Sequence, residues 1–303
     1  MNAQVERVMV GRAQQCTFDA KPLSKALGVE VAGLDLAQPI AREAIVRLRS
    51  LLADNCLLLF RDQRLTPEEH IAFSRNFGEL QPHILKDFNL SGHPELFVVS
   101  NIKADGKAIG RAGAGQYWHT DVSYVEEPSL GSIMYAIEVP ATGGDTMFAN
   151  MYRAYETLSR PMQQFLGDLE AEHDFAHSQV TQIAKKGYTR TASAAEVSSV
   201  PPVLHPVVRM HPESRRPALY VNLGFTTRLM GLEPDESRAV LDLLFAHSTK
   251  PEHVYRHRWQ VGDVVFWDNR SSMHCAIDDY GPEDRRHMVR TTIKGERCVA
   301  YRN

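Results

Sequence analysis

Short segments of alternating hydrophobicity recur from about residue 130 to the C-terminus, each bounded by glycine, proline or asparagine. Alternation with a period of two indicates a strand with one buried face, and short strands at this spacing are typical of a sandwich, a barrel or a jelly roll. The segments are GSIMYAIEV, GGDTMFAN, PVLHPVVRM, ALYVN, DVVFWDN and MVRTTIKG. Helical patterns at 152–169 and 234–248 interrupt them and are expected to pack outside the sheets. The sequence therefore predicts a mainly β fold with flanking helices.

The N-terminal part combines strands with amphipathic helices. The spacing of apolar residues at 41–55 indicates a helix, and the short apolar segment at 56–60 indicates a buried strand. A second helix is predicted at 66–78, because Thr66 and Glu69 can form a capping box at its start.

The chain shows no repeat, no low-complexity tract and no convincing linker, so we expect a single domain over 1–303. Two long segments, 81–116 and 176–201, fit neither a helix nor a strand pattern. Unstructured segments of this length in a compact domain are usually lids or disordered. We predict that both are lid loops over a binding site.

Composition restricts the class of partner. A chain of 303 residues with 43% hydrophobic content can bury a large core. The net charge of −3 reflects charges of both signs that are dispersed along the chain, which argues against a nucleic-acid or membrane partner and favours a small-molecule ligand.

The start of the chain lacks the apolar core of a signal peptide, and no apolar segment approaches the ~18 residues that span a bilayer, so the expected location is the cytoplasm. The four cysteines form no CxxC pair, which argues against a zinc ribbon.

The segment YWHTDVSY at 117–124 carries two possible metal ligands. If it forms a strand, His119 and Asp121 lie on the same face. His274 follows the predicted strand at 264–268, and a jelly roll can bring such distant strands together around one cavity. Two imidazoles and one carboxylate are what a mononuclear non-haem iron(II) site needs to activate oxygen. Taken alone, the HxD pattern is more often a surface pair or a satisfied core hydrogen bond.

The segment DRRHMVR at 284–290 offers cations for an anionic cosubstrate. If it forms a strand, Arg286 and Arg290 share one face, whereas Arg285 and His287 share the other. A guanidinium group matches a carboxylate with two parallel hydrogen bonds. We therefore expect Arg286 and Arg290 to bind anions, and Arg285 and His287 to face solvent.

These motifs belong to an ordered set that resembles the iron(II)- and 2-oxoglutarate-dependent dioxygenases of the TauD/TfdA family. The resemblance extends from about residue 22 to the C-terminus through LFRDQ, FSRNFGEL, WHTDVSY, PATGGDT, EAEHDF, LHPVVRMHP, LYVNLGFTTR, LFAHSTKPE, WDNRSSMH and RRHMVRTTIKG. It implies a double-stranded β-helix, which is a jelly roll, with Fe(II) as the metal and 2-oxoglutarate and O2 as cosubstrates. It implies hydroxylation of a small organic anion, namely a sulfonate, a sulfate ester or a carboxylate, with release of succinate and CO2. Relatives of this kind are commonly oligomeric, which implies a homo-oligomer, either a dimer or a tetramer.

The resemblance also implies roles for individual residues. His119, Asp121 and His274 match the iron ligands of the family. Thr146 and Arg286 match the residues that bind the distal carboxylate of 2-oxoglutarate.

Further matches concern the organic substrate. His83 and Arg290 match residues that hold the acidic group of the substrate, and Phe225 matches an aromatic wall of the same pocket. Gly115 and Lys86 stand where the taurine enzyme has an Asn and a Tyr that contact the substrate. This departure argues against taurine itself as the substrate.

Some interpretations stay open at this level. The glycine-rich segment before the ligand motif carries Lys103, Lys107 and Arg111, which could meet a larger anion, but charged loop residues usually face water. A zinc-dependent hydrolase could use the same His/Asp/His site with a metal-bound water. A non-catalytic jelly roll that binds small anions is the third possibility.

Overall fold

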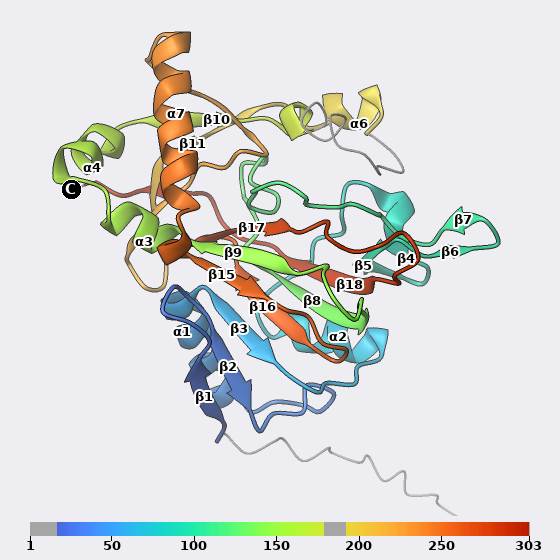
Figure 1. Ribbon diagram of the computed structural model, residues 1–303. Coiled ribbons are helices and arrows are strands. Elements are labelled where there is room, and N and C mark those ends of the chain that lie inside the picture. Colours follow the sequence, from blue (N-terminus) through green and yellow to red (C-terminus); the bar gives the residue numbers. More distant parts are fainter. Residues whose placement is uncertain (1–16, 179–191, 303) are drawn as a thin grey trace, which may run out of the picture.

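A computed structural model describes residues 17–178 and 192–302, and its centre is an eight-stranded main sheet (Figure 1). The strand order is β1-β2-β3-β16-β8-β18-β5-β4, in which β2 and β3 are parallel and the other neighbours are antiparallel. The strands are β1 Asp19–Pro22, β2 Val29–Ala32, β3 Leu57–Phe60, β16 Val264–Asp268, β8 Gly131–Glu138, β18 His287–Ile293, β5 His93–Ser100 and β4 Asn89–Leu90.

A second sheet packs against one face of the main sheet. It consists of β15 (Val254–His257), β9 (Thr146–Asn150) and β17 (Ser272–Ala276), in that order and with antiparallel pairing. One hydrophobic core contains residues from both sheets, including Met134 of β8 and Phe148 of β9. The two packed sheets form the jelly roll that the sequence predicted, so the fold-class prediction is confirmed.

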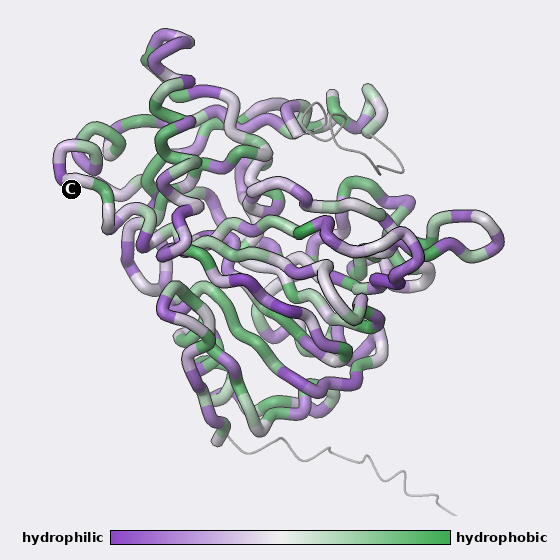
Figure 2. The backbone as a smooth tube through the Cα atoms, viewed as in Figure 1, coloured by the Kyte–Doolittle hydropathy of each residue, from purple (hydrophilic) through white to green (hydrophobic). Residues whose placement is uncertain are grey.

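The main sheet separates two hydrophobic cores, and the alternation of its central strands explains how. Leu57 and Leu59 of β3 face the core shared with the second sheet, whereas Leu58 and Phe60 face the core under the helices. A strand buried on both faces needs apolar residues at every position. This requirement accounts for the uninterrupted CLLLF segment, and Figure 2 shows hydrophobic residues concentrated along the central strands.

Helices α1 (Arg42–Asn55) and α2 (Pro67–Arg75) cover the face of the main sheet that is turned away from the second sheet (Figure 1). The capping box predicted for α2 is present: the Thr66 hydroxyl accepts a hydrogen bond from the Glu69 N–H, and the Glu69 carboxylate accepts one from the Thr66 N–H.

The helix predicted at 152–169 is wrong as one continuous element. The structure has α3 (Met151–Glu156) and α4 (Arg160–Gly167), separated by residues 157–159. Ser159 caps the start of α4, and a proline lies in the first turn of that helix, where its missing N–H costs nothing. The same proline would have interrupted the hydrogen bonds of α3 if that helix had continued through it. The helix predicted at 234–248 is confirmed as α7 (Pro234–Ser248), which packs against β14.

The lid prediction for 81–116 is wrong over much of its length. Residues 93–100 form β5, a strand of the main sheet that pairs with β18. Its start, HPEL, carries little alternation, so periodicity alone did not reveal it. The rest holds the short 3-10 helix η1 (Lys86–Phe88), the edge strand β4 of the main sheet, and the hairpin of β6 (Lys103–Ala104) and β7 (Lys107–Ala108). Within 176–201, residues 179–191 lie outside the described residues, and 194–198 form α6 (Ala194–Ser198).

Two small sheets complete the described fold. One contains β11 (Val203–Pro206), β10 (Glu170–His173) and β14 (Thr226–Leu229), and the other contains β13 (Pro217–Leu219), β12 (Val208–Met210) and β19 (Val299–Ala300). The short helix η2 (Pro251–His253) precedes β15. Within 17–178 and 192–302, no helix is both long enough and apolar enough to cross a lipid bilayer.

Candidate metal centre and its cavity

The structure brings His119, Asp121 and His274 together, and their candidate ligand atoms all lie within 4.8 Å of one another. His274 lies in β17. The His119 N–H donates to the His274 carbonyl at 3.0 Å, and the His274 N–H donates to the His119 carbonyl at 2.8 Å. This reciprocal backbone pair fixes the two imidazoles side by side, with ring centroids 4.2 Å apart.

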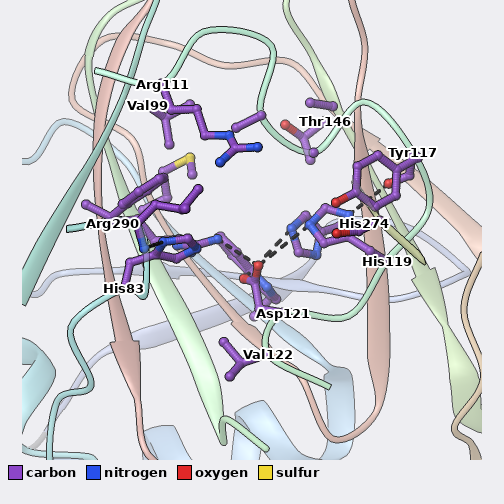
Figure 3. Close-up of a pocket in the computed structure, with 18 of the residues that line it drawn as sticks. His83, Val99, Arg111, Tyr117, His119, Asp121, Val122, Thr146, His274 and Arg290 are labelled. Atoms are coloured by element: carbon purple, nitrogen blue, oxygen red, sulfur yellow. Dashed lines mark hydrogen bonds and ion pairs between the residues drawn. The ribbon is translucent and has the colours of Figure 1, made fainter. Parts of the chain in front are cut away.

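The prediction of a strand at 117–124 is wrong, apart from the backbone pairing of His119 with His274. Residues 121–124 form a turn, and Val122 has a φ of 59°, which ends any extended backbone. Asp121 therefore reaches the imidazoles because the chain turns there, and not because of strand alternation alone. Its Oδ1 lies 3.6 Å from His119 Nε2, and its Oδ2 lies 3.9 Å from His274 Nε2 (Figure 3).

The protonation of the three side chains suits a metal. Nδ1 of His119 lies 2.8 Å from the Tyr117 carbonyl, which can only accept, so this nitrogen carries the hydrogen and Nε2 is the atom available to a metal. Burial, and next the neighbouring His119, hold the pKa of His274 well below its ordinary value. Burial tends to raise the pKa of Asp121, but Arg290 and the two imidazoles outweigh it and hold that pKa well below the ordinary value.

Asp121 is oriented by its own hydrogen-bond network. The Ser132 hydroxyl donates to Oδ2 at 2.8 Å, and Arg290 Nη1 donates to Oδ1 at 2.7 Å. Asn269 Nδ2 in turn donates to the hydroxyls of Ser129 and Ser132. Partners of this kind hold a ligand in place before the metal arrives. The donor set therefore fits a divalent metal such as Fe(II).

Two glycines permit the close packing around His119. A Cβ atom on Gly224 would lie 2.4 Å from the Tyr117 ring and 3.0 Å from the His119 Cβ. Gly115 has a φ of +72°, and a Cβ there would lie 2.8 Å from His119 Cε1. Gly224 was not identified from the sequence, because the close approach of its segment to the ligand motif is a tertiary contact.

The three ligand residues lie in one cavity with Arg286 and Thr146, as the resemblance implies. Arg286 is buried, and its Nε donates to the Gly144 carbonyl at 3.2 Å. The Thr146 hydroxyl accepts a hydrogen bond from Trp259 Nε1 at 2.9 Å. Since an indole can only donate, the hydroxyl keeps its own hydrogen for another acceptor.

The residues expected for the organic substrate, His83, Arg290 and Phe225, line the same cavity. His83 Nδ1 accepts a hydrogen bond from the Leu85 N–H at 3.0 Å, which places the hydrogen of the neutral ring on Nε2. Burial, and then the charges of Arg290 and Arg111, hold the pKa of His83 well below its ordinary value. Phe225 is buried, lines the cavity and also packs in a small cluster with Tyr124 and Phe175.

Arg111 is the main residue that the sequence interpretation missed. Lys103 and Lys107 are exposed in the β6–β7 hairpin, as predicted, but Arg111 is only 5% exposed and lines the cavity (Figure 3). Tyr117 and Tyr124 also line it and had no assigned role. The empty space between these side chains amounts to about 860 Å³ when the open solvent at the mouth of the cavity is included.

Two imidazoles and one carboxylate beside a cavity of a jelly roll are the donor set that a mononuclear metal site of the oxygenase type requires. The family model described as "Taurine catabolism dioxygenase TauD, TfdA family" matches residues 19–292. The chain belongs to the TauD/TfdA dioxygenase family.

Individual relatives agree with this assignment. The chain is 35% identical over 290 residues to the alpha-ketoglutarate-dependent 2,4-dichlorophenoxyacetate dioxygenase of Cupriavidus pinatubonensis, covering 92% of this chain and 99% of that protein. It is 30% identical to the alpha-ketoglutarate-dependent sulfate ester dioxygenase of Pseudomonas putida, covering 92% and 90% of the two chains. The crystal structure of AAD-2 in complex with Mn(II) and N-oxalylglycine superposes with a TM-score of 0.77 at 31% identity, covering 93% and 100%. These relatives give no support to a zinc hydrolase or to a non-catalytic binding module.

Proposed function

We propose that this chain uses Fe(II), 2-oxoglutarate and O2 to hydroxylate a small organic anion. In this reaction one oxygen atom enters the C–H bond of the substrate, and the other enters succinate as 2-oxoglutarate loses CO2. The observation that carries the proposal is the convergence of His119, Asp121 and His274 in one cavity with Arg286 and Arg290.

The ligand residues would hold the metal through His119 Nε2, His274 Nε2 and the Asp121 carboxylate. When bound, Fe(II) supplies the activation of oxygen that drives the oxidation. Ser132 keeps the carboxylate turned toward the imidazoles, and the apolar walls of the cavity limit water at the reacting carbon.

Arg286 and Thr146 would bind the distal carboxylate of 2-oxoglutarate. The guanidinium group is held by the Gly144 carbonyl, and the Thr146 hydroxyl has a free hydrogen because Trp259 donates to its oxygen. A charged and a neutral donor at one place match the two oxygens of a carboxylate.

The organic substrate would place its acidic group against Arg290 and the Nε2–H of His83, with Phe225 beside its apolar part. The names of two relatives give 2,4-dichlorophenoxyacetate and sulfate esters as their substrates. These names support a carboxylate, a sulfate ester or a sulfonate as the substrate of this chain. Gly115 offers no side chain to a substrate, and Lys86 is exposed in η1, so taurine is not the expected substrate. A cytoplasmic location, a homo-oligomer and the absence of a nucleic-acid or membrane partner remain predictions.

An assay of succinate formation tests the proposal. The protein is loaded anaerobically with Fe(II) and 2-oxoglutarate, mixed with aerated buffer, and given aryloxyalkanoates, alkyl sulfates and sulfonates in turn. We expect at least one class to increase succinate formation, and we expect His119→Ala to remove the effect. Substrate cleavage that continues without O2 would favour a hydrolase, and no succinate from any metal-loaded preparation would contradict the proposal.

A further inference from the structure

The segment 143–145 leads directly into β9 and supports both residues that would bind the distal carboxylate of 2-oxoglutarate. Thr146 is the first residue of β9. Arg286 Nε donates to the Gly144 carbonyl at 3.2 Å, and among the described residues this is the hydrogen bond that its guanidinium group makes. The position of the Gly144 carbonyl therefore helps to set the direction in which Arg286 points.

Two consecutive glycines make this segment intrinsically flexible. Gly143 has a φ of +81° and Gly144 has a φ of +68°, which residues with a side chain rarely adopt. Glycine also has more backbone freedom to lose on folding than any other residue. Contacts from outside the segment must therefore hold the Gly144 carbonyl in place.

Asp279, in the segment that follows β17, supplies such a contact. Its Oδ1 accepts a hydrogen bond from the Gly144 N–H at 2.7 Å. Gly144 is buried, so its N–H would lose this partner without gaining water in exchange. The two segments lie close together, because a Cβ on Gly143 would be 2.5 Å from the Asp279 carbonyl oxygen. Asp279 thus fixes the same residue whose carbonyl holds Arg286.

Further contacts join the two segments, and their exposure indicates which one matters most. The Ile277 N–H donates to the Asp145 carbonyl at 2.9 Å. Arg256 of β15, the strand beside β9 in Figure 1, donates to Asp145 Oδ2 at 2.6 Å and to Asp279 Oδ2 at 2.9 Å. The Arg256 side chain is 48% exposed, and exposed ion pairs contribute little. The hydrogen bond from the buried Gly144 N–H is therefore the stronger constraint.

We propose that Asp279 is a positioning residue for the cosubstrate: by holding the Gly144 N–H, it keeps the Gly144 carbonyl where that carbonyl aims Arg286 at the distal carboxylate. This inference rests on the proposed function, because it concerns the 2-oxoglutarate site. It assigns a role to a residue that does not itself line the cavity.

Calorimetry with two chelators isolates the distal carboxylate. The protein is loaded with Mn(II), and the probes are N-oxalylglycine, which carries a distal carboxylate, and oxamate, the same oxalyl amide without it. We expect the wild type to bind N-oxalylglycine more tightly than oxamate. Asp279→Ala should weaken N-oxalylglycine by roughly tenfold, which corresponds to the loss of one hydrogen bond to a charged group, and should leave oxamate unchanged.

Matched variants separate this hydrogen bond from charge. Asp279→Asn keeps an oxygen that can accept from the Gly144 N–H, so it should bind N-oxalylglycine within about twofold of the wild type. Arg256→Gln removes exposed ion pairs and leaves that hydrogen bond, so its effect should be equally small. Asp278→Ala is the control, because it removes an exposed carboxylate at the adjacent position.

Mn(II) affinity and the melting temperature of each variant distinguish positioning from a general structural role. Both should stay at the wild-type value in Asp279→Ala. The inference is overturned if the wild type binds the two chelators equally, or if Asp279→Ala binds N-oxalylglycine as the wild type does. It is also overturned if Asp279→Ala weakens oxamate or Mn(II) to the same extent, or if Asp278→Ala or Asp279→Asn causes the same loss.

Succinate formation keeps this result distinct from the proposed function. In turnover, we expect Asp279→Ala to raise the KM for 2-oxoglutarate and to leave the KM for the organic substrate unchanged. A loss of N-oxalylglycine affinity in Asp279→Ala, combined with no O2-dependent succinate from the wild type, would support the inference and count against the oxidation. Substrate-stimulated succinate with an unchanged KM for 2-oxoglutarate in Asp279→Ala would support the oxidation and overturn the role of Asp279.

Discussion

Arg290 Nη1 lies 2.7 Å from Asp121 Oδ1, so a cation expected to bind the substrate contacts a residue expected to bind the metal. Both side chains are buried. Without metal, the carboxylate neutralises the guanidinium group directly. A bound metal withdraws charge from the same carboxylate and leaves Arg290 more available to an anion.

Metal loading is therefore expected to strengthen anion binding. We predict that Mn(II) increases the affinity for an aryloxyacetate such as phenoxyacetate by roughly 5-fold to 100-fold, which is the usual range of coupling between two sites. Calorimetry with and without Mn(II) measures the change. The coupling should be smaller in Arg290→Gln and unchanged in Arg285→Gln, whose side chain pairs with Glu138 at the surface. Equal coupling in the wild type and Arg290→Gln would contradict the prediction.

Ser132→Ala should weaken the metal site without touching a ligand. The change removes the hydrogen bond of 2.8 Å to Asp121 Oδ2 and leaves that oxygen free to rotate away from the imidazoles. We expect metal affinity to fall by roughly tenfold, as it does when other partners of metal ligands are removed. A competitive titration with a chelating dye measures it. Ser91→Ala, at an exposed turn, is the control, and an equal loss there would show that the effect is not local.

Gly224→Ala should cost stability and disturb the metal centre together. Its Cβ would lie 2.4 Å from the Tyr117 ring, so the ring or the backbone must move, and we expect a loss of about 1–3 kcal/mol in the free energy of unfolding. Gly167→Ala is a matched control, because a Cβ there meets nothing within 4 Å. It should be neutral or slightly stabilising in urea unfolding. A Gly224→Ala protein with normal stability and normal metal affinity would refute the packing argument.

Stability is expected to fall on acidification, with His70 as one contributor. Burial lowers the pKa of His70 to about 4, so the folded protein keeps this ring neutral while the unfolded chain binds a proton below pH ~6.5. Its contribution is fully present above pH ~6.5 and decreases by about 1.4 kcal/mol per pH unit down to about pH 4. Urea unfolding across this range measures the slope. His70→Gln should reduce the slope of the free energy of unfolding against pH by the contribution of one proton, which is about 1.4 kcal/mol per pH unit. His93→Gln, near the surface, should not reduce it.

Much of the fold could be predicted because its strands obey a local rule. The alternating segments became β8, β9 and β16, and the continuous apolar segment at 56–60 became a strand buried on both faces. The start of β5 shows no such alternation, so that strand was not found. The break between α3 and α4 depended on the cap at Ser159 and on proline, which the apolar spacing does not reveal.

The candidate site could be predicted where residue chemistry and the family resemblance point to the same residues. His119, Asp121 and His274 are metal-ligand types in the pattern that a metal requires, and the structure brings them together. Arg111 and Lys107 look alike in the sequence, because both are cations in a glycine-rich segment. The contact of Gly110 with Val98 buries one of them, and that contact exists only in the folded chain.

The reciprocal backbone bonds between His119 and His274 also determine when the metal centre can form. One histidine is made before the middle of the chain, and the other arrives with the second-to-last strand of the jelly roll. A ribosome-bound chain that has not yet released β17 therefore lacks one of the three candidate ligands. Only a chain that has formed β17 offers all three candidate ligands, so we expect a bound metal to stabilise the finished fold more than its early intermediates.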